Sequence, residues 1–164
     1  MYEKHANSIA SFFVQIALPL AKRSRFLNPG DEVVPGIRAV DAAGHSPGLL
    51  AYQIESEGKR LLIWADTCIH YAIALQRPEW HVDVDDDKEK AAATRKRILD
   101  MVATDGLFVA GFHMPFPGLG FVESGRDSPC DWQANPHMPF TVDKLLTGIG
   151  SVTSCGMRPP EAKE

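Results

Sequence analysis

The stretch Gly44-His45-Ser46-Pro47-Gly48 decides how the rest of the chain is interpreted, because it places a histidine in a tight turn between two expected strands. Asp66 directly follows the apolar run Leu61-Leu62-Ile63-Trp64-Ala65, and His113 directly follows the apolar run 107–112. Side chains that follow neighbouring strands can converge on one point, and a rigid support of this kind suits a metal site. The pattern therefore makes these three side chains candidate metal ligands.

Composition narrows the class of protein. The chain has 164 residues, 45% apolar and 23% charged, which is ordinary for one globular domain with a core of its own. The net charge of −4 gives no basic surface for nucleic acid, so we expect no nucleic-acid partner. Three cysteines do not form a disulfide framework, which favours the cytoplasm.

No apolar run is long enough to cross a membrane, so we expect no membrane partner. The nearest candidate, Ile9 to Ala21, is interrupted by Gln15 and Pro19. It could be the apolar part of a secretory signal, but its periodicity favours a buried amphipathic helix from Glu3 to about Leu18.

The rest of the chain predicts alternating strands and helices. Apolar and alternating runs predict strands at 33–34, 37–42, 49–55, 60–65, 107–112 and 121–123. A helix is expected to begin near Asp86, with Glu89 completing a capping box, and to end near Thr104, with Gly106 as its cap. Asp85 is interpreted as part of a solvated run of aspartates. A further helix is possible at Phe140–Ile149.

Five stretches in the same order resemble one known family, the metallo-β-lactamase-fold metallohydrolases, in the branch of methyl parathion hydrolase and the lactonase-like enzymes. The matching stretches are Val34-Pro35-Gly36-Ile37, Gly44-His45-Ser46-Pro47-Gly48, Leu62-Ile63-Trp64-Ala65-Asp66, Ala91-Ala92-Ala93-Thr94-Arg95 and the ten residues from Gly111 to Gly120. The resemblance covers about residues 26 to 123 and corresponds to the C-terminal half of the family's domain.

The resemblance implies an α/β fold and a site. In the family, a four-layer αββα sandwich holds two zinc-type divalent ions at the edge between its sheets. His45 takes the place of the ligand that completes the first metal's shell, Asp66 that of the carboxylate bridging both metals, and His113 that of the second metal's last ligand. Asp66 is accordingly also the expected catalytic residue, since the metal pair turns a bridging water into a hydroxide nucleophile near neutral pH. The implied substrate is a small ester, lactone or phosphotriester.

The family's earlier His-x-His-x-Asp-His motif is absent, and His5 is the only histidine before His45. We therefore expect half of the sandwich, a mixed sheet with helices on one face. This truncated domain would span residues 1–123, and a divergent, poorly ordered tail would span 124–164. Trp64 and Phe116 are expected in the core rather than in a substrate pocket.

Three functions remain open on the sequence. The chain could be a hydrolase whose missing ligands come from a second chain or from a complementing N-terminal half. It could be a non-catalytic remnant that forms a homodimer through an uncovered apolar sheet face. It could also bind one metal ion weakly through His45, Asp66 and His113, without turnover.

Overall fold

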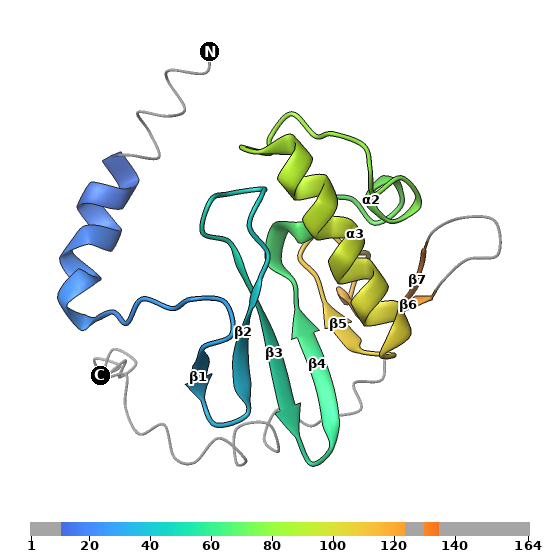
Figure 1. Cartoon of the computed structure of the whole chain (residues 1–164), viewed down its shortest axis with the longest axis horizontal. Coiled ribbons are helices and arrows are strands. Elements are labelled where there is room, and N and C mark those ends of the chain that lie inside the picture. The colour runs from blue at the N-terminus through green and yellow to red at the C-terminus, as the bar shows by residue number, and fades with distance from the viewer. Residues whose placement is uncertain (1–10, 124–129, 135–164) are drawn as a thin grey trace, which may run out of the picture.

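A computed structural model of the chain describes residues 11–123 and 130–134. They form a seven-stranded mixed sheet in which the strands follow one another in the order of the sequence (Figure 1). The strands are β1 Glu32–Val34, β2 Ile37–Asp41, β3 Leu50–Ser56, β4 Lys59–Ile63, β5 Phe108–Ala110, β6 Leu119–Glu123 and β7 Asp131–Ala134. The helical elements are η1 Phe13–Ala17, η2 Leu18–Arg23, η3 Ala65–Thr67, α2 Ile73–Gln76 and α3 Lys88–Thr104. The expected α/β architecture, a mixed sheet with its main helix on one face, is confirmed.

Tight turns connect β1 to β2 and β3 to β4, whereas the loop of residues 42–49 connects β2 to β3. β1 and β2 pair antiparallel around Pro35 and Gly36, and β3 and β4 pair antiparallel around Glu57 and Gly58. Glu57 and Gly58 have φ angles of 51° and 72°, a left-handed pair that matches the twist of a two-residue hairpin. These hairpins lie where the turn residues of the sequence predict them.

α3 connects the only parallel pair among the described strands, β4 and β5. Its N-cap is Asp87, whose side chain accepts a hydrogen bond from the backbone N–H of Lys90; the predicted cap, Asp86, lies one residue earlier. Gly106, with φ 58°, follows the helix end as expected. The crossover places the C-terminal ends of β4 and β5 at the same edge of the sheet.

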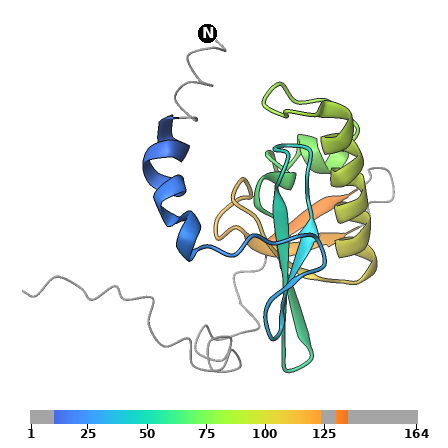
Figure 2. The same cartoon turned by 60° about the vertical axis from the view of Figure 1, so that its left-hand side comes forward.

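The core lies between α3 and one face of the sheet, and α3 covers that face in both ribbon views (Figures 1 and 2). The contributing residues are Ala51, Leu62, Val109 and Val122 from the sheet and Ile98, Leu99 and Val102 from α3. Residues that pair across strands share a face. The opposite face is also apolar, with Tyr52 beside Ile63 and Ile54 beside Leu61. Tyr52, Ile54 and Ile63 are half-buried there.

The segment from Phe13 to Arg23 corrects the sequence interpretation. It forms a π-helix followed by a 3-10 helix, with Pro19 in the second of these, and it stands away from the sheet in Figure 2. Phe12 and Ile16 are 65% and 54% exposed, so the expected burial of this helix is wrong over its described part. Among residues 11–123 and 130–134, no helix is long and apolar enough to cross a bilayer.

β7 lies beyond the predicted domain boundary at residue 123. It pairs antiparallel with β6, and no element was predicted there. Its register places Trp132 opposite Val122, and the Trp132 ring lies 5.8 Å from the ring of Trp64 between centroids. The boundary itself stays a prediction, and the possible helix at Phe140–Ile149 lies outside the described residues.

Candidate metal centre

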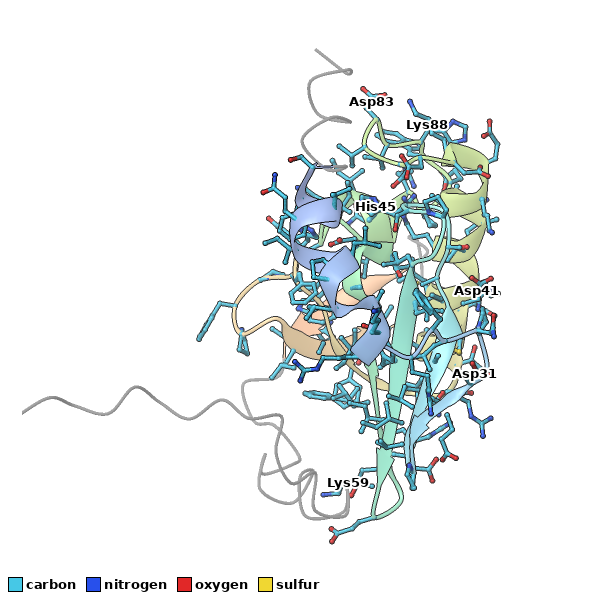
Figure 3. All side chains as sticks on the ribbon, turned by 90° about the vertical axis from the view of Figure 1, so that its left-hand side faces the viewer. Asp31, Asp41, His45, Lys59, Asp83 and Lys88 are labelled. Carbon is cyan, nitrogen blue, oxygen red and sulfur yellow. The ribbon has the colours of Figure 1, made fainter. Side chains whose placement is uncertain are left out.

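The structure brings the three predicted ligands together at one end of the sheet. His45 lies in the loop between β2 and β3, at the end opposite the Lys59 turn (Figure 3). Asp66 lies in η3 after β4, and His113 lies in the loop after β5. His113 Nε2 is 3.0 Å from Asp66 Oδ1, and His45 Nε2 is 3.9 Å from Asp66 Oδ2. Each oxygen of one carboxylate therefore faces a different imidazole.

Strand register explains why Asp66 and His113 meet. Ile63 of β4 is aligned with Ala110 of β5, and the two site residues each come three positions after these partners. Equal offsets beyond a parallel pair bring both side chains to the same edge. A tight turn aims Asp66 outward, with Ala65 at φ 50°. The sequence signal of an apolar run followed by a polar residue was therefore a valid guide to position.

The His45 ring is hydrogen-bonded to Asp85, a residue that the sequence analysis did not identify as part of the site. Its Nδ1 lies 3.0 Å from Asp85 Oδ1, and the other oxygen of Asp85 lies 3.1 Å from Arg95 Nη2. The side chains of Asp85 and Arg95 are 1% and 2% exposed. The interpretation of Asp85 as a solvated residue is therefore wrong. An arginine on the buried stripe of α3, between Ala91 and Ile98, was the available signal, because a buried arginine needs an anionic partner.

The start of α3 fixes the backbone around His45. The backbone N–H of Asp87 donates to Gly44 O over 3.0 Å, and the Thr94 hydroxyl donates to Ala43 O over 2.7 Å. A Cβ on Gly44 would lie 2.4 Å from the backbone of Ala91, and the φ of Gly44 is 143°. Only glycine permits this close approach, which explains the glycine before the histidine.

His113 lies on a more exposed support. The backbone N–H of Gly111 donates to Gly118 O over 2.9 Å, so the six residues between them project from the sheet as a loop. The His113 side chain is 47% exposed. Phe116 in the same loop is 97% exposed, so its expected place in the core is wrong, whereas Trp64 is fully buried as expected. Gly111 makes room for Trp64, since a Cβ there would lie 2.3 Å from the indole nitrogen.

The donor types and spacings fit a divalent metal ion. With zinc–ligand bonds of about 2.0–2.1 Å, two tetrahedral ligands of one ion lie roughly 3.3 Å apart. The imidazole–carboxylate separations of 3.0 and 3.9 Å lie on either side of that value. Imidazole nitrogen and carboxylate oxygen are also the donors that zinc-type ions accept.

The number of donors is short of a complete site. His45 and His113 face opposite oxygens of Asp66, so each side of the carboxylate has one imidazole, whereas catalytic zinc takes three protein ligands and a water. In the part of the chain that the structure describes, no group of three or more His, Cys, Asp or Glu side chains is arranged to hold a metal ion. The donor types and their spacing therefore fit a zinc-type ion, but the number of donors does not complete its coordination.

Cys68 is two residues from Asp66 but is not available as a ligand. It is fully buried. Burial raises the pKa of its thiol to about 12, an effect that the nearby Arg95 cation only partly offsets. A ligand must be a thiolate, so Cys68 acts as a small core residue.

Several solved structures are similar to this chain, although the comparisons by sequence find no match. No protein-family model and no curated protein matches the sequence. Solved structures do match: a hydrolase of the beta lactamase superfamily, AbOPH, has a TM-score of 0.69 and 29% identity over 80% of this chain. AidC, a dizinc quorum-quenching lactonase, has a TM-score of 0.63 and 28% identity over 70% of this chain. A probable metal-dependent hydrolase from Staphylococcus aureus shares the fold alone, at a TM-score of 0.55 and 20% identity over 72% of this chain.

The matches cover only part of these proteins. The chain spans 46% of AbOPH, 38% of AidC and 42% of the staphylococcal protein. The resemblance found in the sequence is nevertheless confirmed by structure. The chain has part of the metallo-β-lactamase fold, and the proteins that it resembles are the metal-dependent hydrolases of that superfamily.

Proposed function

We propose that this chain contributes one side of a dinuclear, zinc-type hydrolase site, with Asp66 as the carboxylate that bridges the two ions. The observation that carries the proposal is the position of Asp66 between two imidazoles, with one of its oxygens facing His113 and the other facing His45. A carboxylate so placed can bind one cation on each oxygen, which is the bridging arrangement of two-metal sites with ions about 3.5–4 Å apart.

The residues of this chain position the ions rather than react with substrate. Asp66 would hold the two cations, and His45 and His113 would each supply one neutral imidazole nitrogen. When bound, such ions act as Lewis acids and lower the pKa of a bound water toward 7, which supplies hydroxide as the nucleophile. The further ligands would come from a second chain or from a complementing N-terminal half.

The substrate class is a small carboxylic ester, lactone or phosphotriester. Support comes from the neighbours: AidC is a lactonase whose structure holds the product N-hexanoyl-L-homoserine, and AbOPH is a hydrolase. A dinuclear centre suits all three classes, because each presents a carbonyl or phosphoryl oxygen that a cation can polarise. The three classes differ in leaving group and shape, so they can be separated by assay.

The test combines zinc uptake with hydrolysis. We expect the purified chain at saturating zinc to bind up to two ions, and Asp66→Ala to lose both together, because the bridge is common to them. Elemental analysis after gel filtration measures uptake, and a nitrophenyl ester, a homoserine lactone and a nitrophenyl phosphotriester measure activity. Asp100→Ala, an exposed carboxylate on α3, is the matched control. Equal zinc uptake by Asp66→Ala and the unaltered chain would contradict the proposal.

The alternative is a non-catalytic protein that forms a homodimer. The sheet face that includes Tyr52, Ile54 and Ile63 favours it, because these apolar side chains are only half-buried and none of the described helices covers that face. Apolar surface that is left partly exposed promotes association. A twofold pair would bury the same face of both copies. In the same purification, a metal-free species of twice the chain mass by light scattering supports this alternative. A monomer that takes up zinc excludes it.

A further inference from the structure

Behind His45 lies a buried ion pair that the proposed function does not use. Arg95 Nη2 lies 3.1 Å from Asp85 Oδ2, and the rest of the guanidinium donates to main-chain oxygens. These acceptors are Thr67 O at 3.2 Å, Pro78 O at 2.9 Å and Trp80 O at 3.0 Å. A charge this deeply buried is costly unless it is paired, and here the guanidinium donates to the Asp85 carboxylate and to three carbonyl oxygens. The arrangement holds Asp85 in one orientation.

The charges on this pair determine where the proton of His45 lies. Arginine stays protonated in proteins, and the carboxylate that it faces accepts hydrogen bonds at both oxygens. Asp85 Oδ1 therefore requires a donor, and the atom 3.0 Å away is His45 Nδ1. In the neutral ring, Nε2 then keeps its lone pair. That nitrogen lies 3.9 Å from Asp66 Oδ2, too far for a hydrogen bond and on the side where an ion would bind.

We propose that Asp85, backed by Arg95, is a positioning residue that holds His45 as the Nδ1–H tautomer and presents the Nε2 lone pair to the first metal ion. The presentation of Nε2 to a metal ion rests on the proposed function. The Nδ1–H tautomer of His45, in contrast, is a property of the metal-free chain. Partners of this kind typically contribute 10- to 100-fold to metal affinity, because they fix both the ring orientation and the tautomer.

The same guanidinium also supports the bridging carboxylate. Arg95 Nε donates to the carbonyl of Thr67, the residue after Asp66, and the Thr67 hydroxyl donates to Trp64 O over 2.6 Å. One buried cation thus fixes the backbone of η3 and, through Asp85, the ring of His45. Among the described residues, the hydrogen-bond partner of the His113 ring is Asp66 itself, with His113 Nε2 3.0 Å from Asp66 Oδ1, and no buried carboxylate lies behind that ring as Asp85 does behind His45.

The tautomer can be measured directly on the unaltered chain. Nitrogen-15 shifts of the imidazole rings at about pH 9, where histidine is neutral, distinguish the two tautomers in the absence of metal. We expect His45 to show Nδ1–H and a free Nε2. An Nε2–H tautomer for His45 would overturn the proposal, and this outcome needs no variant and no metal.

The variant Asp85→Asn tests whether Asp85 determines the tautomer of His45. The amide oxygen will face Arg95, because turning the NH2 group there would set donor against donor. The NH2 group then donates to His45 Nδ1, so the proton moves to Nε2, where it blocks the ion. We expect the tautomer to reverse and zinc affinity, measured by chelator competition, to fall by about 10- to 100-fold. Asp86→Asn, the exposed neighbour, should leave both unchanged.

The outcomes separate the two proposals. If the unaltered chain shows the Nδ1–H tautomer and Asp85→Asn reverses it, but neither binds zinc, the proposed function fails and the orientation of His45 by Asp85 stands. If Asp85→Asn binds zinc as tightly as the control Asp86→Asn and the unaltered chain do, the role of Asp85 in metal binding is overturned. Arg95 keeps three carbonyl acceptors in Asp85→Asn, which favours a folded variant. Should it unfold, the tautomer of the unaltered chain still decides.

Discussion

The two histidines of the site have the same side chain but very different surroundings. The His45 side chain is 23% exposed and lies against Asp85, which pairs in turn with Arg95, and the last two side chains are almost fully buried. His113 is 47% exposed and lies in a loop with Phe112 and Phe116, which are 77% and 97% exposed. One side of the site is therefore part of the core, whereas the other lies at the surface. Changes behind His45 should therefore affect stability and metal binding together, and changes around His113 should not.

The largest effect is expected from removing the buried cation. Arg95→Met leaves the Asp85 carboxylate buried without its partner, and breaking a buried pair in this way costs about 3–5 kcal/mol of unfolding free energy. Urea unfolding followed by circular dichroism measures the loss. Lys96→Met, the exposed next residue on α3, should change the unfolding free energy by less than about 0.5 kcal/mol. Equal stability of the two variants would contradict the claim that the His45 side of the site is part of the core.

A smaller loss is expected where the His45 loop touches α3. Gly44→Ala places a Cβ 2.4 Å from the backbone of Ala91 at a φ of 143°, so the loop or the helix must move. Strain and overpacking together predict a loss of about 2–4 kcal/mol, again by urea unfolding. Because the loop carries His45, zinc uptake should fall with it. A variant as stable as the unaltered chain would show that the contact is not tight.

The smallest effect is expected at the equivalent glycine of the other loop. Gly118 has φ 72°, and an added Cβ would lie 3.0 Å from the carbonyl oxygen of Gly111. Gly118→Ala should cost about 1–2 kcal/mol of unfolding free energy, mainly through the left-handed backbone. If Gly118→Ala proved more damaging than Gly44→Ala, the surface character of the His113 side would be wrong.

The same contrast explains what the sequence could predict. The hairpin turns, α3 and the positions of Asp66 and His113 follow from local signals, namely turn residues, periodicity and polar residues that end apolar runs. Asp85 depends on contacts with His45, 40 positions earlier, and Arg95, 10 positions later, which no local pattern encodes. Its neighbours Asp86 and Asp87 are exposed, so the run as a whole indicated a solvated segment.

Two further departures have the same physical origin. Periodicity in the segment that contains Phe12 and Ile16 shows which side of a helix is apolar, but not whether another element covers it, and here both side chains are exposed. β7 is a four-residue strand, Asp131–Ala134, whose place depends on pairing with β6. Short strands have weak sequence signals because their stability comes from the partner strand.

The central claim is that Asp66 is shaped to hold one cation on each of its oxygens. The most direct measurement is anomalous diffraction at the zinc edge from crystals grown at saturating zinc. We expect two peaks about 3.5–4 Å apart on either side of the Asp66 carboxylate, one beside His45 Nε2 and one beside His113 Nε2. Zinc bound only at sites away from Asp66 would contradict it.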